Sequence, residues 1–258
     1  MKQNIKIGLA QINPVLGDLP GNAKKITNFI KEADQQGIDL LIFPELAITG
    51  YLPQDLLLNR SFIDCNLQCL NKITAACRSS MVVILGYVAR ENGKLYNAAT
   101  VIKSGQLIAT RYKTLLPNYD VFDERRYFTP ANENLPVPIE IGGHSVRLGV
   151  EICEDLWDSN SAIKVTDQLV AQGAELLVNL SASPFEYDKR DRRRQLADRP
   201  IRLRKQNCAG WEISIPPVAP PPRAPQNDAP PPAPDPPHPA GRKVSCFPAG
   251  LTAVRLCE

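Results

Sequence analysis

Three side chains of different chemistry each come just after a short apolar run of the sequence: Glu45, Lys113 and Cys153. Together they could hydrolyse an acyl compound, because a carboxylate can accept the thiol proton, a thiolate can attack an acyl carbon and an ammonium can stabilise the oxyanion. Each residue also has a simpler interpretation. Cys153 is then a packed core cysteine, Lys113 a solvated loop lysine and Glu45 a surface carboxylate. Only the combination favours catalysis.

The apolar runs predict strands, and the first of them alternate with helical patterns. A β-α-β-α-β order indicates a sheet with crossover helices. Ser104-Gly105 and Gly142-Gly143 then predict two hairpins, which make the sheet mixed. The expected strands are 5–12, 40–43, 81–87, 98–103, 106–112, 137–141, 146–152 and 176–180, and the expected helices lie around 26–33, 62–77 and 161–172. The C-terminal ends of parallel strands lie along one edge of a sheet, and the three residues are expected to converge at that edge.

Composition favours a soluble globular protein. The chain has 258 residues, 43% of them hydrophobic, and a formal net charge of +3. The positive charge lies in residues 189–258, so residues 1–188 offer no surface suited to nucleic acid. No apolar run is long enough to span a membrane. The N-terminus lacks the apolar stretch of a signal peptide, which predicts a cytoplasmic location.

The cysteines give no sign of a disulfide framework or a metal site. There are seven, an odd number without regular spacing, so reduced thiols are expected. Cys65, Cys69 and Cys77 have a near-helical spacing in an apolar segment, and the chain holds only two histidines. Packing explains these three thiols better than metal binding does.

Three local motifs resemble the signature blocks of the carbon–nitrogen hydrolases, the nitrilase superfamily, in the order of that family. They are Phe-Pro-Glu-Leu at 43–46 with Thr-Gly-Tyr at 49–51, Tyr-Lys-Thr-Leu-Leu-Pro at 112–117, and Gly-Val-Glu-Ile-Cys-Glu-Asp at 149–155. The resemblance implies a four-layer αββα sandwich of the nitrilase type. It also implies a triad with Glu45 as general base, Cys153 as nucleophile and Lys113 on the tetrahedral intermediate.

The same resemblance suggests two further groups near the triad. The backbone N–H of Glu154 would complete the oxyanion hole, and Glu124 resembles an additional carboxylate near the lysine. For Glu124 a surface position in the charged run 123–126 is an equally good interpretation.

Within the superfamily, the sequence is most similar to the glutaminase domains of glutamine-dependent NAD⁺ synthetases. Segments 51–57, 116–128 and 152–157 carry that likeness. It implies hydrolysis of L-glutamine without a cofactor, with Tyr119, Ser183 and Lys189 contacting the substrate, and assembly into a homo-oligomer. ATP and deamido-NAD⁺ would be used by a synthetase domain. For Ser183 a turn before proline, and for Lys189 a solvated charge, remain alternatives.

The likeness covers residues 1–196, which predicts a sandwich that is incomplete at its C-terminal end. Residues 197–258 are rich in proline, and 15 of the 24 prolines lie in 200–258. Proline runs disfavour helices and interior strands, so this tail is predicted to be disordered. A frameshift, a mispredicted end and a lineage-specific tail each explain the change in pattern.

Three other functions stay open at this point. The three catalytic residue types also serve members of the superfamily that hydrolyse other amides or nitriles. An inactive fragment is a second alternative. The basic run 189–205, with nine Lys or Arg followed by proline runs, is a third, as a tail that binds nucleic acid or an acidic partner.

Overall fold

The computed structural model describes residues 4–184, 191–192, 195–196, 213–214 and 253–256, and the account below concerns those residues. Strands and helices alternate in the first half of the chain, and hairpins follow. The elements are β1 (Ile5–Leu9), α1 (Leu19–Gln35), β2 (Leu40–Ile42), α2 (Arg60–Ala76), β3 (Val82–Glu91), β4 (Lys94–Lys103), β5 (Gln106–Tyr112), β6 (Val137–Ile141), β7 (His144–Ile152), α3 (Val165–Ala171), β8 (Leu176–Leu180), β9 (Ile213–Ser214) and β10 (Ala253–Leu256).

The strands form two sheets. The first has the order β5-β4-β3-β2-β1-β9, in which β1, β2 and β3 are parallel neighbours and β4 and β5 follow as antiparallel hairpins. The second has the order β10-β8-β7-β6, with β7 and β8 parallel. Since β5 runs parallel to β2, the C-terminal ends of both strands point to the same edge of the first sheet.

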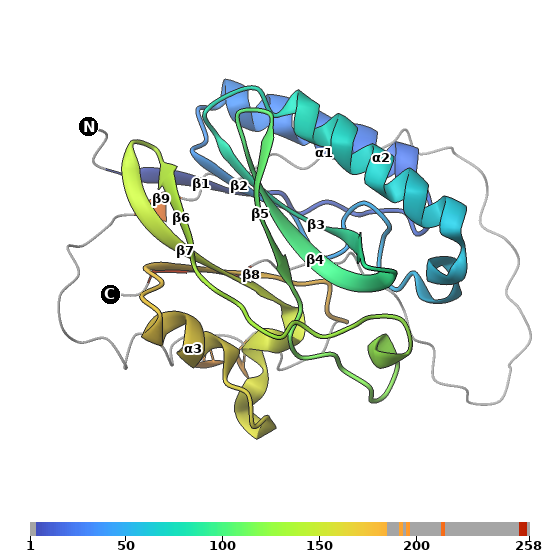
Figure 1. Cartoon of the computed structure of the whole chain (residues 1–258). Helices are drawn as coiled ribbons and strands as arrows, with labels where there is room; N and C mark the ends of the chain where they lie inside the picture. The colour runs from blue at the N-terminus through green and yellow to red at the C-terminus, as the bar shows by residue number, and fades with distance from the viewer. Residues whose placement is uncertain (1–3, 185–190, 193–194, 197–212, 215–252, 257–258) are drawn as a thin grey trace, which may run out of the picture.

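Helices α1 and α2 cover the outer face of the first sheet (Figure 1). Each begins at a side chain that accepts backbone N–H bonds: Asp18 accepts from Gly21 at 3.0 Å, and Asn59 accepts from Ser61 at 2.9 Å. Their apolar faces pack on the alternate residues of β2 and β3 that face the helices, in one core cluster. This cluster also contains Cys69 and Cys77, and Cys65 packs against it. These three cysteines are therefore packing residues of the core.

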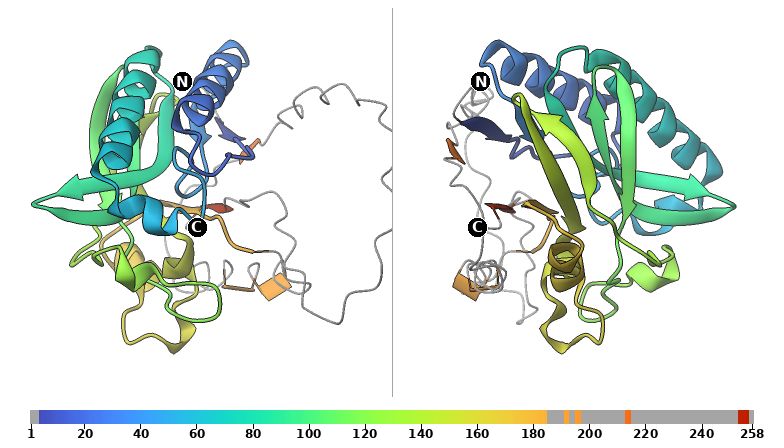
Figure 2. Two further views of the ribbon diagram at one scale, coloured as in Figure 1. Left: turned by 90° about the vertical axis from the view of Figure 1, so that its right-hand side faces the viewer. Right: turned by 60° about the vertical axis from the view of Figure 1, so that its left-hand side comes forward.

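The two sheets pack face to face, and α3 covers the outer face of the second sheet. A separate core cluster joins residues of β1–β4 with residues of β6, β7 and β8, and a smaller one joins α3 to Leu177 of β8. Figure 2 shows the resulting layers, with α1 and α2 on one side, the two sheets between, and α3 on the other. The four-layer αββα sandwich of the sequence analysis is therefore confirmed.

The strand pattern by itself did not divide the strands between two sheets, and several local boundaries differ, among them the start of α1, which lies at Leu19 rather than near residue 26. β3 and β4 form a long hairpin through Asn92-Gly93, which the sequence analysis did not predict; both turn residues have positive φ, 50° and 76°. β1 ends at Leu9 rather than at residue 12. Helix α3 begins at Val165 rather than at residue 161, and Asp158–Asn160 form a separate 3₁₀ turn before it.

Two short strands lie within the tail that was predicted to be disordered. β9 pairs with β1 in parallel at the border of the first sheet, and β10 pairs with β8 at the border of the second. Neither contains proline, and their Ile-Ser and Ala-Val-Arg-Leu sequences can supply ladder hydrogen bonds. Apart from these six residues, 197–258 falls outside the described residues, and disorder of the tail stays a prediction.

No helix among the described residues combines the length and apolar character that crossing a membrane would require.

Gly86 of β3 lies directly beneath the turn that carries Glu45. A Cβ at this position would come within 2.4 Å of the Pro44 carbonyl oxygen, 2.6 Å of the Leu46 nitrogen and 2.7 Å of the Glu45 Cα. All three atoms belong to the backbone, so they cannot move aside as a flexible side chain can. The absence of a side chain at residue 86 therefore lets the turn after β2 rest on β3.

We expect Gly86→Ala to lower the free energy of unfolding by about 2 kcal/mol, the usual cost of overpacking a core, and to displace Glu45. Chemical denaturation monitored by circular dichroism measures the change. Gly8→Ala is the matched control, because a Cβ there meets the side chain of Leu41 at 3.0 Å. Equal losses in the two variants would contradict the role given to Gly86.

Candidate active site

A lysine with no exposed surface lies at the centre of the site. Lys113, the residue after β5, donates a hydrogen bond from Nζ to Oε1 of Glu45 and another to Oε1 of Glu124, both at 2.9 Å. Glu45 is 1% exposed and Glu124 2%. Both carboxylates are thus buried with the ammonium, and the alternative interpretation of Lys113 and Glu45 as surface groups is wrong.

The charges of these carboxylates keep Lys113 protonated. Burial by itself lowers the pKa of the lysine, because the apolar surroundings disfavour the ammonium form. The negative charges of Glu45 and Glu124 outweigh that effect and raise the pKa well above its ordinary value. Lys113 therefore acts as a fixed positive charge rather than as a proton donor at neutral pH.

Glu45 is held by donors on three sides. Its Oε1 accepts from Asn97 Nδ2 at 2.8 Å as well as from Lys113, and its Oε2 accepts from the backbone N–H of Ala182 at 3.0 Å. Asn97 comes from β4, and Ala182 comes from the loop after β8 in the other sheet. The carboxylate therefore links the two sheets at the edge where the strands end.

Glu124 begins a 3₁₀ turn and faces the same ammonium. The hydroxyl of Tyr51 donates to its Oε1 at 2.9 Å, while no described residue bonds its Oε2. Burial raises the pKa of Glu124, the charge of Lys113 opposes the rise, and the charge of Glu45 adds to it. Glu124 therefore accepts a proton more readily than an exposed glutamate does.

Cys153 stands at the turn between β7 and a short 3₁₀ turn, Cys153–Leu156. Its φ of 46° lies in the left-handed region, which non-glycine residues seldom adopt and which is common at functional turns. The Sγ atom lies 3.3 Å from Oγ of Ser183. The carbonyl oxygen of Cys153 accepts from Asn179 Nδ2 at 3.3 Å, which ties the turn to β8.

The thiol of Cys153 is neutral in this environment. Burial raises its pKa, the charge of Glu45 raises it further, and the charge of Lys113 lowers it, with a result of about 12. Ser183, which contacts the thiol, directly follows Ala182, whose N–H bonds Glu45, and Glu45 in turn pairs with Lys113. These contacts bring together the three residues that the sequence analysis grouped, with Glu45 and Lys113 coming from the first sheet and Cys153 from the second.

Two of the three residues expected to contact substrate lie near Cys153 or its neighbour. Ser183 contacts the thiol, as described above. Tyr119, 55% exposed, donates its hydroxyl to the Glu154 carboxylate, at 3.0 Å from each oxygen. Lys189 falls outside the described residues.

Sequence reasoning missed Asn97, Tyr51 and Asp155 as parts of the site. Asn97 and Asp155 are polar residues in or next to apolar runs, and both are fully buried. A buried polar side chain needs partners, so a polar residue inside a predicted strand was the available signal. For Tyr51, which contacts Glu124 from a loop 73 residues away, the signal was its place in the Thr-Gly-Tyr motif at 49–51.

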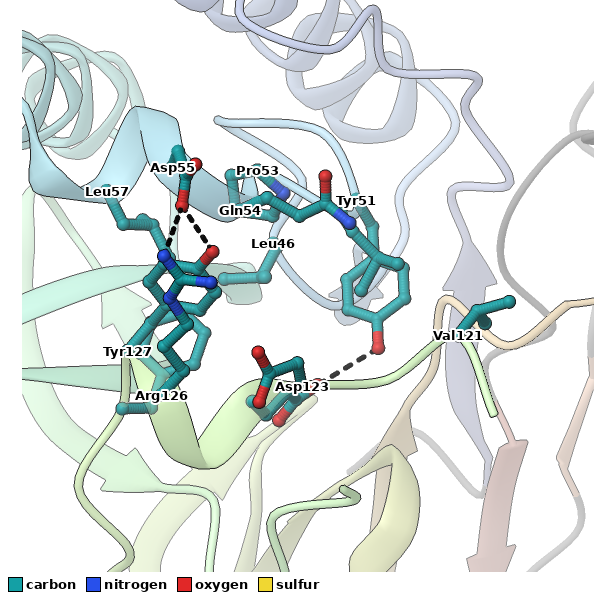
Figure 3. Close-up of a pocket in the computed structure, with 13 residues that line it drawn as sticks. Leu46, Tyr51, Pro53, Gln54, Asp55, Leu57, Val121, Asp123, Arg126 and Tyr127 are labelled. Carbon is teal, nitrogen blue, oxygen red and sulfur yellow. Dashed lines mark hydrogen bonds and ion pairs between the residues drawn. The ribbon is translucent and has the colours of Figure 1, made fainter. Parts of the chain in front are cut away.

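Two hollows adjoin the site. A pocket of about 210 Å³ is lined by Tyr51, Glu124 and residues of 52–57 and 121–128. Figure 3 shows Asp55 at this pocket, in contact with the Tyr127 hydroxyl at 2.6 Å and the Arg126 guanidinium at 3.5 Å. An open depression on another side is lined by Tyr119, Glu154 and neighbouring residues of 114–118 and 157–163. It borders the residue next to the thiol.

The family profile described as Carbon-nitrogen hydrolase matches residues 6–199. That range contains Glu45, Lys113 and Cys153, together with β2–β8 and all of β1 except Ile5. The chain belongs to the carbon–nitrogen hydrolase family. The resemblance drawn from the three sequence motifs is confirmed.

Several relatives of this carbon–nitrogen hydrolase are longer proteins. It is 41% identical over 188 residues to the glutamine-dependent NAD(+) synthetase of Thermotoga maritima, covering 72% of this chain and 31% of that protein. It is 40% identical over 197 residues to the enzyme of the same name from Synechocystis, covering 71% of this chain and 35% of that protein. The chain thus spans about a third of the length of these relatives.

Solved structures show the same fold. The glutamine-dependent NAD⁺ synthetase from Acinetobacter baumannii, in complex with adenosine diphosphate, superposes with a TM-score of 0.66 at 34% identity, over 76% of this chain and 36% of that one. An amidase from Nesterenkonia sp. superposes with a TM-score of 0.64 at 20% identity, over 78% and 73% of the two chains. The second likeness concerns the fold alone.

The raised pKa of the Cys153 thiol predicts how its reactivity depends on pH. A free cysteine with a pKa of about 8.5 reaches its maximal alkylation rate near pH 9 to 10. With a pKa of about 12, Cys153 should instead react with iodoacetamide about tenfold faster for each unit of pH from 7 to 10, without levelling off. Peptide mass spectrometry of quenched samples follows the Cys153 peptide alone. A plateau below pH 9 would contradict the assignment.

Proposed function

We propose that this chain carries out the glutaminase reaction of a glutamine-dependent NAD⁺ synthetase, the hydrolysis of the side-chain amide of L-glutamine to glutamate and ammonia. The observation that carries the proposal is the buried ammonium of Lys113, paired with Glu45 at 2.9 Å beside a buried thiol. Relatives near 40% identity named glutamine-dependent NAD(+) synthetase support glutamine as the substrate.

The reaction begins with a neutral thiol. Glu45 accepts the proton of Cys153 as Sγ attacks the amide carbon, and the carbonyl oxygen becomes an oxyanion. The ammonium of Lys113 and the backbone N–H of Glu154 stabilise that oxyanion. Glu45 then returns the proton to the departing nitrogen, the carbon–nitrogen bond breaks, and ammonia leaves a thioester. Glu45 next takes a proton from water as the water oxygen attacks the thioester. The carbon–sulfur bond then breaks, glutamate leaves, and Glu45 returns the proton to the departing sulfur, which restores the thiol and the carboxylate.

Deprotonation is coupled to substrate binding in this scheme. Burial and the charge of Glu45 keep the resting thiol protonated, so no free thiolate waits in the empty site. When an amide is bound, the negative charge that develops on sulfur passes to the amide carbonyl oxygen, so the thiol can lose its proton. The donors to Glu45, Asn97 and the Ala182 N–H, hold the carboxylate in place for the proton transfer.

Glutamine is held, in this proposal, by hydroxyls and charge at the mouth of the site. Ser183 lies beside the thiol, and Tyr119 lies with Glu154 in the open depression. A zwitterionic amino acid requires a partner for its ammonium and one for its carboxylate. Glu154 suits the first, and for the second we propose Lys189, which the resemblance implies is a substrate contact.

The remaining steps of NAD⁺ synthesis belong to parts of the relatives that this chain does not match. Amidation of deamido-NAD⁺ with ATP, a cytoplasmic location and assembly into a homo-oligomer are therefore proposed by similarity to the longer relatives. Hydrolysis of another amide is the second candidate, suggested by the amidase fold neighbour. That neighbour is only 20% identical, which supports the fold and not the substrate.

We expect Cys153→Ala to abolish ammonia release from L-glutamine, with a loss of at least about a thousandfold, because the covalent step has no other nucleophile. A coupled assay for glutamate measures the rate. Cys69→Ala, at a buried position of α2, is the matched control and should retain activity. Ammonia release unchanged by Cys153→Ala would refute the proposal, and activity on other amides but not glutamine would favour the second candidate.

A further inference from the structure

Asp155 is a fully buried aspartate two residues beyond the nucleophile. Its Oδ1 accepts from the backbone N–H of Thr114 at 3.0 Å and of Leu115 at 2.8 Å. Its Oδ2 accepts from the backbone N–H of Ile152 at 3.0 Å. The side chain is 0% exposed, so water does not compete for these three hydrogen bonds.

The three donors flank the two reacting groups. Thr114 and Leu115 directly follow Lys113 at the end of β5, and Ile152 directly precedes Cys153 at the end of β7. These strands belong to different sheets. One carboxylate therefore joins the backbone that carries the ammonium to the backbone that carries the thiol.

The bonding pattern suits a carboxylate and no other side chain of its size. All three partners are N–H donors, and an ionised carboxylate accepts at both oxygens. An asparagine would present an NH₂ group to one of these donors, which loses one bond and places two donors face to face. Burial raises the pKa of Asp155 to about 7, against the opposing influence of the bonds from Leu115 and Ile152. Burying this carboxylate is costly, and the three bonds offset the cost.

We propose that Asp155 is a positioning residue that sets the separation between the Lys113 ammonium and the Cys153 thiol. It does not touch the substrate and acts through the two backbone segments. The proposal rests on the proposed function for its effect on glutamine hydrolysis, but the arrangement of the two groups can be tested without any turnover.

The first test is the kinetics of glutamine hydrolysis by Asp155→Asn in the full chain. A misplacement of about 1 Å between reacting groups can lower a rate by about a hundredfold. We expect kcat to fall by about that factor while KM changes by less than about threefold, because the substrate contacts lie elsewhere. Asp158→Asn, an equally buried aspartate three residues further along, is the matched control and should retain kcat.

The second test uses iodoacetamide at pH 8, which reports the thiolate fraction of Cys153 and needs no hydrolysis. The positive charge of Lys113 lowers the pKa of this thiol, so both Lys113→Met and Asp155→Asn should slow alkylation. If Asp155 acts by holding Lys113 near the thiol, the double variant should be no slower than Lys113→Met alone. Additive slowing would overturn the proposal, as would an unchanged kcat in Asp155→Asn.

The two tests separate the two proposals. A wild-type chain that releases no ammonia from glutamine would refute the proposed function, and the alkylation cycle would still decide the role of Asp155. If Asp155→Asn does not fold by circular dichroism, Asp155→Glu keeps the carboxylate and moves it by one methylene. The same non-additivity with Lys113→Met is then expected, and additive rates would again overturn the proposal.

Discussion

The buried ammonium of Lys113 is the interaction on which the rest of the site depends. A single positive charge without solvent contact is stable only where negative charge surrounds it, and here Glu45 and Glu124 supply it at 2.9 Å each. The two carboxylates in turn need donors, which come from Asn97, Tyr51 and the Ala182 N–H. Each added partner extends the buried network and ties another strand or loop to it.

That network explains why the site lies where the two sheets meet. Glu45 and Lys113 stand at the ends of parallel strands in the first sheet, while Cys153 and Ala182 follow parallel strands of the second. Packing the sheets face to face brings both edges together and excludes water from the space between them. Low dielectric strengthens the attraction between the charges and also keeps the thiol protonated. The same burial therefore organises the charges and keeps the Cys153 thiol protonated, which is the resting state that the proposed mechanism starts from.

Much of the fold follows from local patterns, and the exceptions have physical causes. The apolar runs identified the strands β1–β8, and turn residues located two hairpins. The hairpin through Asn92-Gly93 was missed because the apolar run of β3 ends before the turn. The tip of the hairpin extends beyond the core, where Arg90 and Glu91 are exposed. The strands β9 and β10 were missed because short edge strands of two and four residues carry no periodicity that could be recognised.

The sequence by itself determined which residue types stand at the ends of the strands, and three motifs in order identified the family and its candidate triad. Local order encodes such features, because strand ends and turns depend on neighbouring residues. The tertiary structure alone decided that the triad spans two sheets, that Glu124 is buried, and that Asp155 connects the segments around Lys113 and Cys153. Those features arise from contacts between residues about 10 to 140 positions apart, such as Ala182 with Glu45, and no local pattern records which distant donor meets which acceptor.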